Sequence, residues 1–176
     1  KLCSLGLKEG QEGFNKEEHE KAEGVVIWCV RLHKKRAKPG PDRKEGSLES
    51  PKTSRAWKIS ELIDFFGTVE KPAKGAYFAK PDGCANGMLE PGTTDVYWKK
   101  SMLLAANYQE ILEVSDTCPG NHAHVAIRGS VKLPGGGWDS RARLSGVYPL
   151  RLCLVWGRAI AKACLRLSSP AAERWA

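Results

Sequence analysis

Apolar residues recur at three- and four-residue steps in two long stretches of the chain, which is the spacing of one helix face. The first stretch begins near Asn15 and the second follows Pro149. Acidic residues near the start of the first stretch and basic residues near its end suit the helix dipole, and Pro39-Gly40-Pro41 ends it. Pro149 suits the first turn of the second helix. The apolar stripe of that helix consists of Leu152, Val155, Trp156, Ala159, Ile160, Ala163, Cys164 and Leu167.

Shorter patterns of strand and helix type alternate between these two helices. We expect strands at 47–50, 76–79, 101–106, 125–127 and 130–133, a helix at 54–66, a helical turn at 109–114 and a loop tip at 134–137. Such alternation favours a mixed α/β layer over a helix bundle or a β-sandwich. We therefore predict one α/β domain over residues 16–167, with a disordered lead-in at 1–15 and a tail at 168–176.

The positive charge of the chain is concentrated at its end. Residues 118–176 hold nine basic and two acidic residues, and therefore most of the net charge of +8. A basic segment can attract phosphate backbones, or it can simply form a solvated surface. Trp138, at the predicted loop tip, would stack on an unpaired base in the first case and pack into the core in the second.

The composition excludes a membrane-spanning protein and argues against a disulfide scaffold. The longest apolar run has six residues (25–30), far below the ~20 that a membrane-spanning helix needs. The six cysteines form no C-x-x-C pair, so a disulfide scaffold is not expected.

Cys29, Cys153 and Cys164 lie in apolar helical patterns, where a free thiol is usually a small buried hydrophobe. We therefore expect an intracellular protein, nuclear or cytoplasmic, and no secretory signal opens the chain, which we expect to begin within a longer protein.

The segment Cys118-Pro-Gly-Asn-His122-Ala-His124 holds one thiol and two imidazoles within seven residues. These are zinc ligands, and a fourth ligand would complete a tetrahedral site, with Cys84 as the best candidate. The C-x3-H-x-H spacing is not a common zinc-finger spacing, and the alternative is a polar loop whose histidines bind backbone carbonyls.

Two further segments carry candidate chemistry. Glu49 lies at the expected end of a strand, where open α/β sheets place their ligands, although an ordinary strand-to-helix turn capped by Thr53 or Ser54 would look the same. The glycine-rich loop around Cys84 precedes Lys99 and Lys100, which could meet phosphate. A lone cysteine in such a loop is only a weak sign of a nucleophile.

Five motifs together resemble an uncharacterised family of algal, particularly dinoflagellate, proteins associated with retroelements. They are ESPKTSRAW (49–57), CANG (84–87), KKSMLLAAN (99–107), CPGNHAH (118–124) and YPLRLC (148–153). The resemblance covers roughly residues 20–165 and implies a protein that acts on nucleic acid.

The first half of the chain also resembles, more faintly, the second half of the Rossmann-like domain of cytosine-5 DNA methyltransferases. This resemblance implies a partial Rossmann-like open sheet with flanking helices, in which Glu49 matches the carboxylate that holds a flipped cytosine and Lys99 or Lys100 matches a basic position. Ser50 stands where that family has Asn. The cofactor loop and nucleophile turn have no counterpart here, so S-adenosylmethionine would bind only if a preceding segment supplied its site.

The resemblance thus predicts a methyltransferase-like fragment that is inactive alone. The alternative is a non-enzymatic, zinc-stabilised module that binds DNA or RNA through its basic final third, and a third possibility is a decayed reading frame without selected activity. The candidate nucleic-acid contacts are Lys99, Lys100, Arg128, Lys132, Arg141 and Arg143.

Overall fold

The computed structural model describes residues 15–37 and 44–167. In chain order, the elements are α1 (Lys16–Arg36), β1 (Ser47–Pro51), η2 (Arg55–Lys58), α2 (Ser60–Phe66), β2 (Tyr77–Ala79), η3 (Cys84–Asn86), β3 (Tyr97–Trp98), β4 (Met102–Ala106), η4 (Gln109–Val114), β5 (His124–Val125), β6 (Ser130–Lys132), β7 (Trp138–Ser140), α3 (Arg141–Leu144) and α4 (Leu150–Leu167). The expected lead-in at 1–14 and tail at 168–176 lie outside the described residues.

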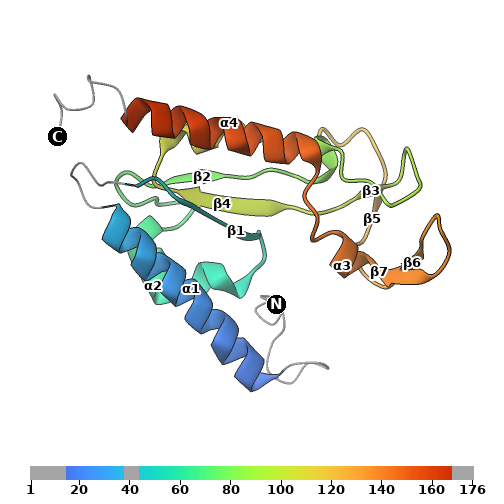
Figure 1. Cartoon of the computed structure of the whole chain (residues 1–176), viewed down its shortest axis with the longest axis horizontal. Coiled ribbons are helices and arrows are strands. Elements are labelled where there is room, and N and C mark those ends of the chain that lie inside the picture. Colours follow the sequence, from blue (N-terminus) through green and yellow to red (C-terminus); the bar gives the residue numbers. More distant parts are fainter. Residues whose placement is uncertain (1–14, 38–43, 168–176) are drawn as a thin grey trace.

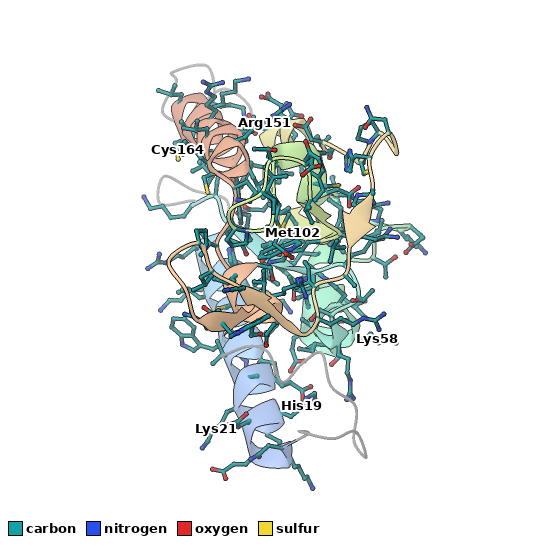
Figure 2. The ribbon with its side chains drawn as sticks, turned by 90° about the vertical axis from the view of Figure 1, so that its right-hand side faces the viewer. His19, Lys21, Lys58, Met102, Arg151 and Cys164 are labelled. Atoms are coloured by element: carbon teal, nitrogen blue, oxygen red, sulfur yellow. The ribbon has the colours of Figure 1, made fainter. Side chains whose placement is uncertain are left out.

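A three-stranded sheet, in the order β1-β4-β2, forms the middle layer of the molecule (Figure 1). Helices α1 and α2 cover one face of the sheet and α4 covers the other. All five residues of the central strand β4 are buried, and they alternate between the two faces. Leu104 contributes to the core under α4, whereas Ala105 contributes to the core under α1 and α2. This double coverage explains why β4 is a continuous apolar run, and Met102 lies in the middle of the molecule (Figure 2).

The first helix forms where the apolar pattern predicts it. The Asn15 side chain accepts a hydrogen bond from the Glu18 N–H at 3.1 Å, which satisfies one free backbone donor at the helix start. Four basic side chains in the last turn, His33 to Arg36, complement the dipole. Ala22, Val26 and Val30 are the buried residues of this helix.

The helix predicted at 54–66 is divided at Ile59, whose backbone is extended (φ −70°, ψ 127°). Ser54 caps the first piece, η2, by accepting a hydrogen bond from the Ala56 N–H at 3.2 Å. Gly67 ends the second piece, α2, with a left-handed φ of +75°. The segment that follows Glu49 is therefore a strand-to-helix turn capped by Ser54, which was the alternative to a ligand site at a strand end.

The mixed α/β character is confirmed, but a Rossmann-like topology is not. Rossmann sheets are mainly parallel, whereas β1 and β2 both pair with β4 in antiparallel register. The one parallel pairing among the described residues joins the two-residue strands β3 and β5. Local sequence patterns identify strands but not their partners, which explains the difference. No helix in the described ranges has the length and apolar character needed to cross a membrane.

The segment 118–149 extends beyond one end of the sheet (Figure 1). Here β6 and β7 form an antiparallel hairpin around the predicted glycine loop tip, and α3 follows directly. Helix α4 then returns across the sheet as predicted. Leu152, Ala159 and Ala163 are its buried residues, but Ile160 and Cys164, which the sequence placed on its apolar stripe, are exposed.

Candidate metal centre

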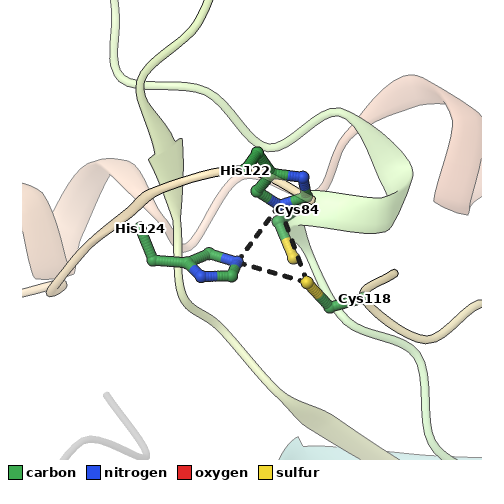
Figure 3. A group of neighbouring side chains, drawn as sticks. All are labelled: Cys84, Cys118, His122 and His124. Atoms are coloured by element: carbon green, nitrogen blue, oxygen red, sulfur yellow. Dashed lines mark hydrogen bonds between the residues drawn. The ribbon is translucent and has the colours of Figure 1, made fainter. Parts of the chain in front are cut away.

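Four side chains with metal-binding atoms come together from two parts of the chain, the turn at Cys84 and the segment 118–124 (Figure 3). They belong to Cys84, Cys118, His122 and His124, and their ligand atoms all lie within 4.8 Å of one another. The Cys118 Sγ lies 3.6 Å from His122 Nε2 and 3.4 Å from His124 Nε2. The two Nε2 atoms are 3.1 Å apart. This group could hold a metal ion, and it includes the fourth donor that the sequence suggested.

Cys84 is the buried member of the group and is held by a tight turn. It begins η3, which ends at Gly87 with a left-handed φ of 83°. The Asn86 side chain is buried and donates to the Asp82 carbonyl at 3.0 Å, and the Gly83 N–H donates to the Lys100 carbonyl at 2.7 Å. These hydrogen bonds therefore stabilise the turn internally and attach it to the segment that precedes β4.

Asp82 joins the two cysteine segments, although the sequence assigned it no role. Its Oδ2 accepts a hydrogen bond from the Cys118 N–H at 2.9 Å, and its own N–H donates to the Asp116 carbonyl at 2.8 Å. Its Oδ1 accepts from the Ser101 hydroxyl. These bonds bring two cysteines together that are 34 positions apart in the sequence.

The histidines are positioned by the short parallel pairing of β5 with β3, in which His124 lies opposite Tyr97. The Tyr97 ring also contacts the His122 ring, with centroids 4.2 Å apart and an interplanar angle of 30°. The His122 Nδ1 lies 3.1 Å from the Asn121 Oδ1. With Nδ1 as donor to this amide oxygen, Nε2 is left with a lone pair aimed at the cluster.

Electrostatics favour the neutral thiol at Cys84 while no metal is bound. Burial, followed by its interaction with Cys118 and the negative charge of Asp82, raises the pKa of Cys84 to about 11. A thiol with so high a pKa is a poor nucleophile at neutral pH. Cys84 is therefore suited to binding a cation, whose positive charge would offset the cost of burying the thiolate. It is poorly suited to covalent catalysis.

An open pocket of about 540 Å³ borders the cluster on one side. Cys84, Tyr97 and His122 contribute to its wall, as do Asp116 and Arg151, whose side chains form an ion pair at 3.1 Å. Solvent therefore reaches the cluster from this side, which offers an entry path for an ion.

Glu49, the expected catalytic carboxylate, is separate from this cluster and lies in the middle of β1, opposite Leu104. The expectation of a strand-end position is therefore wrong. Its Oε2 accepts a hydrogen bond from the Tyr148 hydroxyl, and burial raises the pKa of the carboxyl, with Tyr148 and Lys100 opposing that rise. Burial and the Glu49 carboxylate likewise raise the pKa of Tyr148 well above its ordinary value.

The expected nucleic-acid contacts have different environments. The Lys100 ammonium donates to the Ser145 carbonyl and lies 5.4 Å from the centroid of the Tyr148 ring. Arg141 binds both oxygens of Glu90, at 2.6 and 3.2 Å, and Arg143 pairs with Asp139. The side chains of Lys99, Arg128 and Lys132 are exposed.

Three of the basic side chains of α4 pair with acidic groups of the same molecule. Arg151 pairs with Asp116, Lys162 with Glu113, and Arg166 with Glu110 and Glu45. These ion pairs attach α4 to η4 and its surroundings. The three cations therefore do not form one basic surface together with the hairpin. Trp138, by contrast, is 72% exposed, so of the two alternatives for this residue, packing into the core is wrong.

Comparison with models of known families, with curated proteins and with solved structures yields no match to this chain. The family membership inferred from the five motifs therefore stays a prediction. Sequence reasoning also missed the roles of Asp82, Tyr97 and Asn121. Only Asn121 had a local signal, because it directly precedes a candidate histidine ligand.

Proposed function

We propose that the chain is a non-enzymatic binding module stabilised by one zinc ion held by Cys84, Cys118, His122 and His124. The observation that carries this proposal is the convergence of these four donors within 4.8 Å. Two thiolates and two imidazoles form one of the usual structural zinc donor sets. Four protein ligands fill a tetrahedral shell and leave no open position for a substrate, which favours a structural role over catalysis.

The spacing of the donor atoms supports zinc in particular. Zn–S bonds near 2.3 Å and Zn–N bonds near 2.1 Å produce a tetrahedron with S···N edges of about 3.6 Å and N···N edges of about 3.4 Å. The corresponding distances from Cys118 to the two histidines are 3.6 and 3.4 Å, and the histidine nitrogens are 3.1 Å apart. These three edges fit a zinc tetrahedron, whereas Cys84, whose ligand atom lies within 4.8 Å of the others, would move closer to them on binding.

The surroundings of the donors support the same function. Asn121 would hold His122 in the tautomer that leaves Nε2 free to ligate, as partners of metal-bound histidines commonly do. Zinc would also displace the proton from Cys84, and the charge of the ion would offset the cost of burying the thiolate. The bound ion would add a link between the turn at Cys84 and the segment 118–124, which the Asp82 hydrogen bonds already join.

The methyltransferase-like function stays a prediction that no feature of the described residues favours. A base-holding carboxylate must face a ligand, whereas Glu49 binds Tyr148, which lies just before α4. Nucleic-acid binding without catalysis is the better candidate, because Arg128, Lys132 and Trp138 are exposed on or beside the hairpin.

Elemental analysis of the purified full chain tests the zinc proposal. We expect equimolar zinc in the wild type and loss of zinc in Cys118→Ser and His124→Asn. Cys153→Ser provides a matched control, because Cys153 is a free thiol outside the cluster, and it should retain the metal. Co²⁺ added to the metal-free protein should produce the visible absorption of a tetrahedral thiolate site. A wild-type protein that takes up neither ion would overturn the proposal.

A further inference from the structure

We propose that a groove beside the β6–β7 hairpin binds one unpaired nucleic-acid base, with Trp138 as the stacking platform and Arg128 and Lys132 as phosphate contacts. This inference rests on the proposed binding module, because it names the ligand of that module and the surface that receives it. The site is separate from the metal cluster.

The groove has a volume of about 600 Å³ and lies between the hairpin and the turn at 90–93. Its wall includes Glu90, Gly92, Val131, Pro134, Trp138 and Arg141. Gly92 has a left-handed φ of +80°, and a Cβ atom there would lie 2.8 Å from the Pro134 ring. The two turns therefore approach closely at Gly92, which defines one end of the groove.

The Trp138 indole is available to a ligand. It is 72% exposed, and it lies opposite Lys132 in the hairpin register. An exposed indole with a neighbouring ammonium group is the combination that binds a base through stacking and its phosphate through charge. Stacking accepts any base, so this surface would show little sequence preference.

Charge distinguishes this groove from the other basic surfaces. The carboxylate in the groove, Glu90, is neutralised by Arg141, and the Asp139 carboxylate is paired with Arg143. Arg128 and Lys132 are exposed and, within residues 15–37 and 44–167, have no ion-pair partner. The hairpin region therefore keeps unpaired positive charge at Lys132, opposite Trp138, and at Arg128, which precedes β6.

The geometry favours a single strand over a duplex. Recognition of duplex DNA usually places a helix in the major groove, but the helix next to the hairpin, α3, spans only Arg141–Leu144. One indole matches one unstacked base, and two cations match the neighbouring phosphates. A proline-rich peptide could also use an exposed tryptophan, but it would not need the positive charge.

Fluorescence anisotropy with a short labelled oligothymidylate tests this inference on the zinc-loaded full chain at several salt concentrations. We expect the logarithm of the association constant to fall with the logarithm of salt concentration, with a slope of about −1.4 for two phosphate contacts on a single strand. Trp138→Ala should weaken binding at least about five-fold, which is the lower range for the loss of one stacked base. Lys132→Gln should reduce the slope by about 0.7.

Trp28→Ala is the matched control, because Trp28 is 62% exposed but belongs to α1, and it should leave the affinity unchanged. Equal affinity of wild type and Trp138→Ala, salt-independent binding, or Trp138-dependent binding of a polyproline peptide without affinity for the oligonucleotide would overturn the inference. Zinc content is measured on every sample. Trp138-dependent oligonucleotide binding by a chain that holds no zinc would refute the zinc proposal alone, whereas a zinc-loaded chain without such binding would refute only this inference.

Discussion

Arg141 binds both carboxylate oxygens of Glu90, 51 residues earlier in the chain. The Glu90 Oε2 also accepts a hydrogen bond from the Trp98 indole at 3.1 Å, and Trp98 follows Tyr97, which contacts His122. A continuous set of contacts thus leads from the metal cluster through β3 to the start of α3. The hairpin is connected to the core through this set.

Loss of the Glu90 carboxylate should loosen the hairpin without unfolding the sheet. Arg141 holds the pKa of the Glu90 carboxyl below its ordinary value, so the ionised pair is the favoured state. In Glu90→Gln, we expect faster amide hydrogen exchange in β6 and β7 and unchanged exchange in β4. The exposed Glu70 is a matched control, and Glu70→Gln should leave both unchanged. Equal exchange in the two variants would contradict a connecting role for Glu90.

Removal of the metal should have a local effect. The core on both sides of β4 contains no member of the cluster, so the sheet should survive treatment with a chelator. We expect a lower unfolding temperature and faster hydrogen exchange in β3, β5 and the turn at Cys84. Acid should have the same effect, because thiolates and imidazoles lose the metal when they are protonated. An unfolding temperature that does not respond to either the chelator or restored zinc would contradict this prediction.

Asn121 should increase the metal affinity without touching the ion. Loss of such a partner to a ligating histidine typically weakens metal binding 10- to 100-fold, and because Asn121 is exposed we expect about 10-fold for Asn121→Ala. Asn121→Asp keeps an oxygen acceptor for His122 Nδ1 and should retain most of the affinity. Competition with a chromophoric zinc chelator measures both values. Equal affinities in the two variants would show that the hydrogen bond has no influence.

The buried carboxyl of Glu49 should make stability depend on pH. Burial raises its pKa above the ordinary 4.5, so the folded state binds the proton more tightly than the unfolded state. Stability should therefore fall as the pH rises from about 4.5 through the raised pKa, by about 1.4 kcal/mol for each pH unit in that window. Glu49→Gln cannot ionise and should lack this fall.

Urea unfolding of wild type and Glu49→Gln at matched pH isolates the effect of Glu49, because the cluster titrates equally in both proteins. Tyr148→Phe removes the hydroxyl that donates to the carboxylate, and it should enlarge the pH dependence. Parallel curves for wild type and Glu49→Gln would contradict the raised pKa.

Two glycines with similar positive φ values should respond very differently to alanine. Gly67 and Gly75 have φ values of +75° and +78°, and the ψ of −155° at Gly67 lies in a region that glycine alone normally occupies. A Cβ at Gly67 would also lie 2.4 Å from the Ala73 nitrogen and the Lys71 oxygen, whereas a Cβ at Gly75 meets no atom within 4 Å. Gly67→Ala should therefore reduce the unfolding free energy by more than Gly75→Ala in thermal or urea unfolding. Equal losses would contradict this prediction, because they would mean that the turn at 71–73 can move away from the added Cβ.

The sequence by itself was enough to locate the elements whose signal is local. The apolar period predicts α1 and α4, the buried run predicts β4, and the glycine tract predicts the hairpin tip. Cys118, His122 and His124 also lie within seven residues, so their common chemistry is visible without a fold. These features depend on interactions between near neighbours in the chain.

Only the tertiary structure decided the features that join distant segments. The antiparallel register of β1 with β4 places Glu49 in mid-strand, and the Asp82 hydrogen bonds bring Cys84 to Cys118. Three cations of α4, which belong to the basic segment 118–176, pair with acidic groups of η4 and its surroundings. Trp138 stays exposed because the hairpin extends beyond the sheet. Strand pairing and ion pairing depend on which surfaces come into contact when the chain folds, and the spacing of residues along the sequence does not specify those contacts.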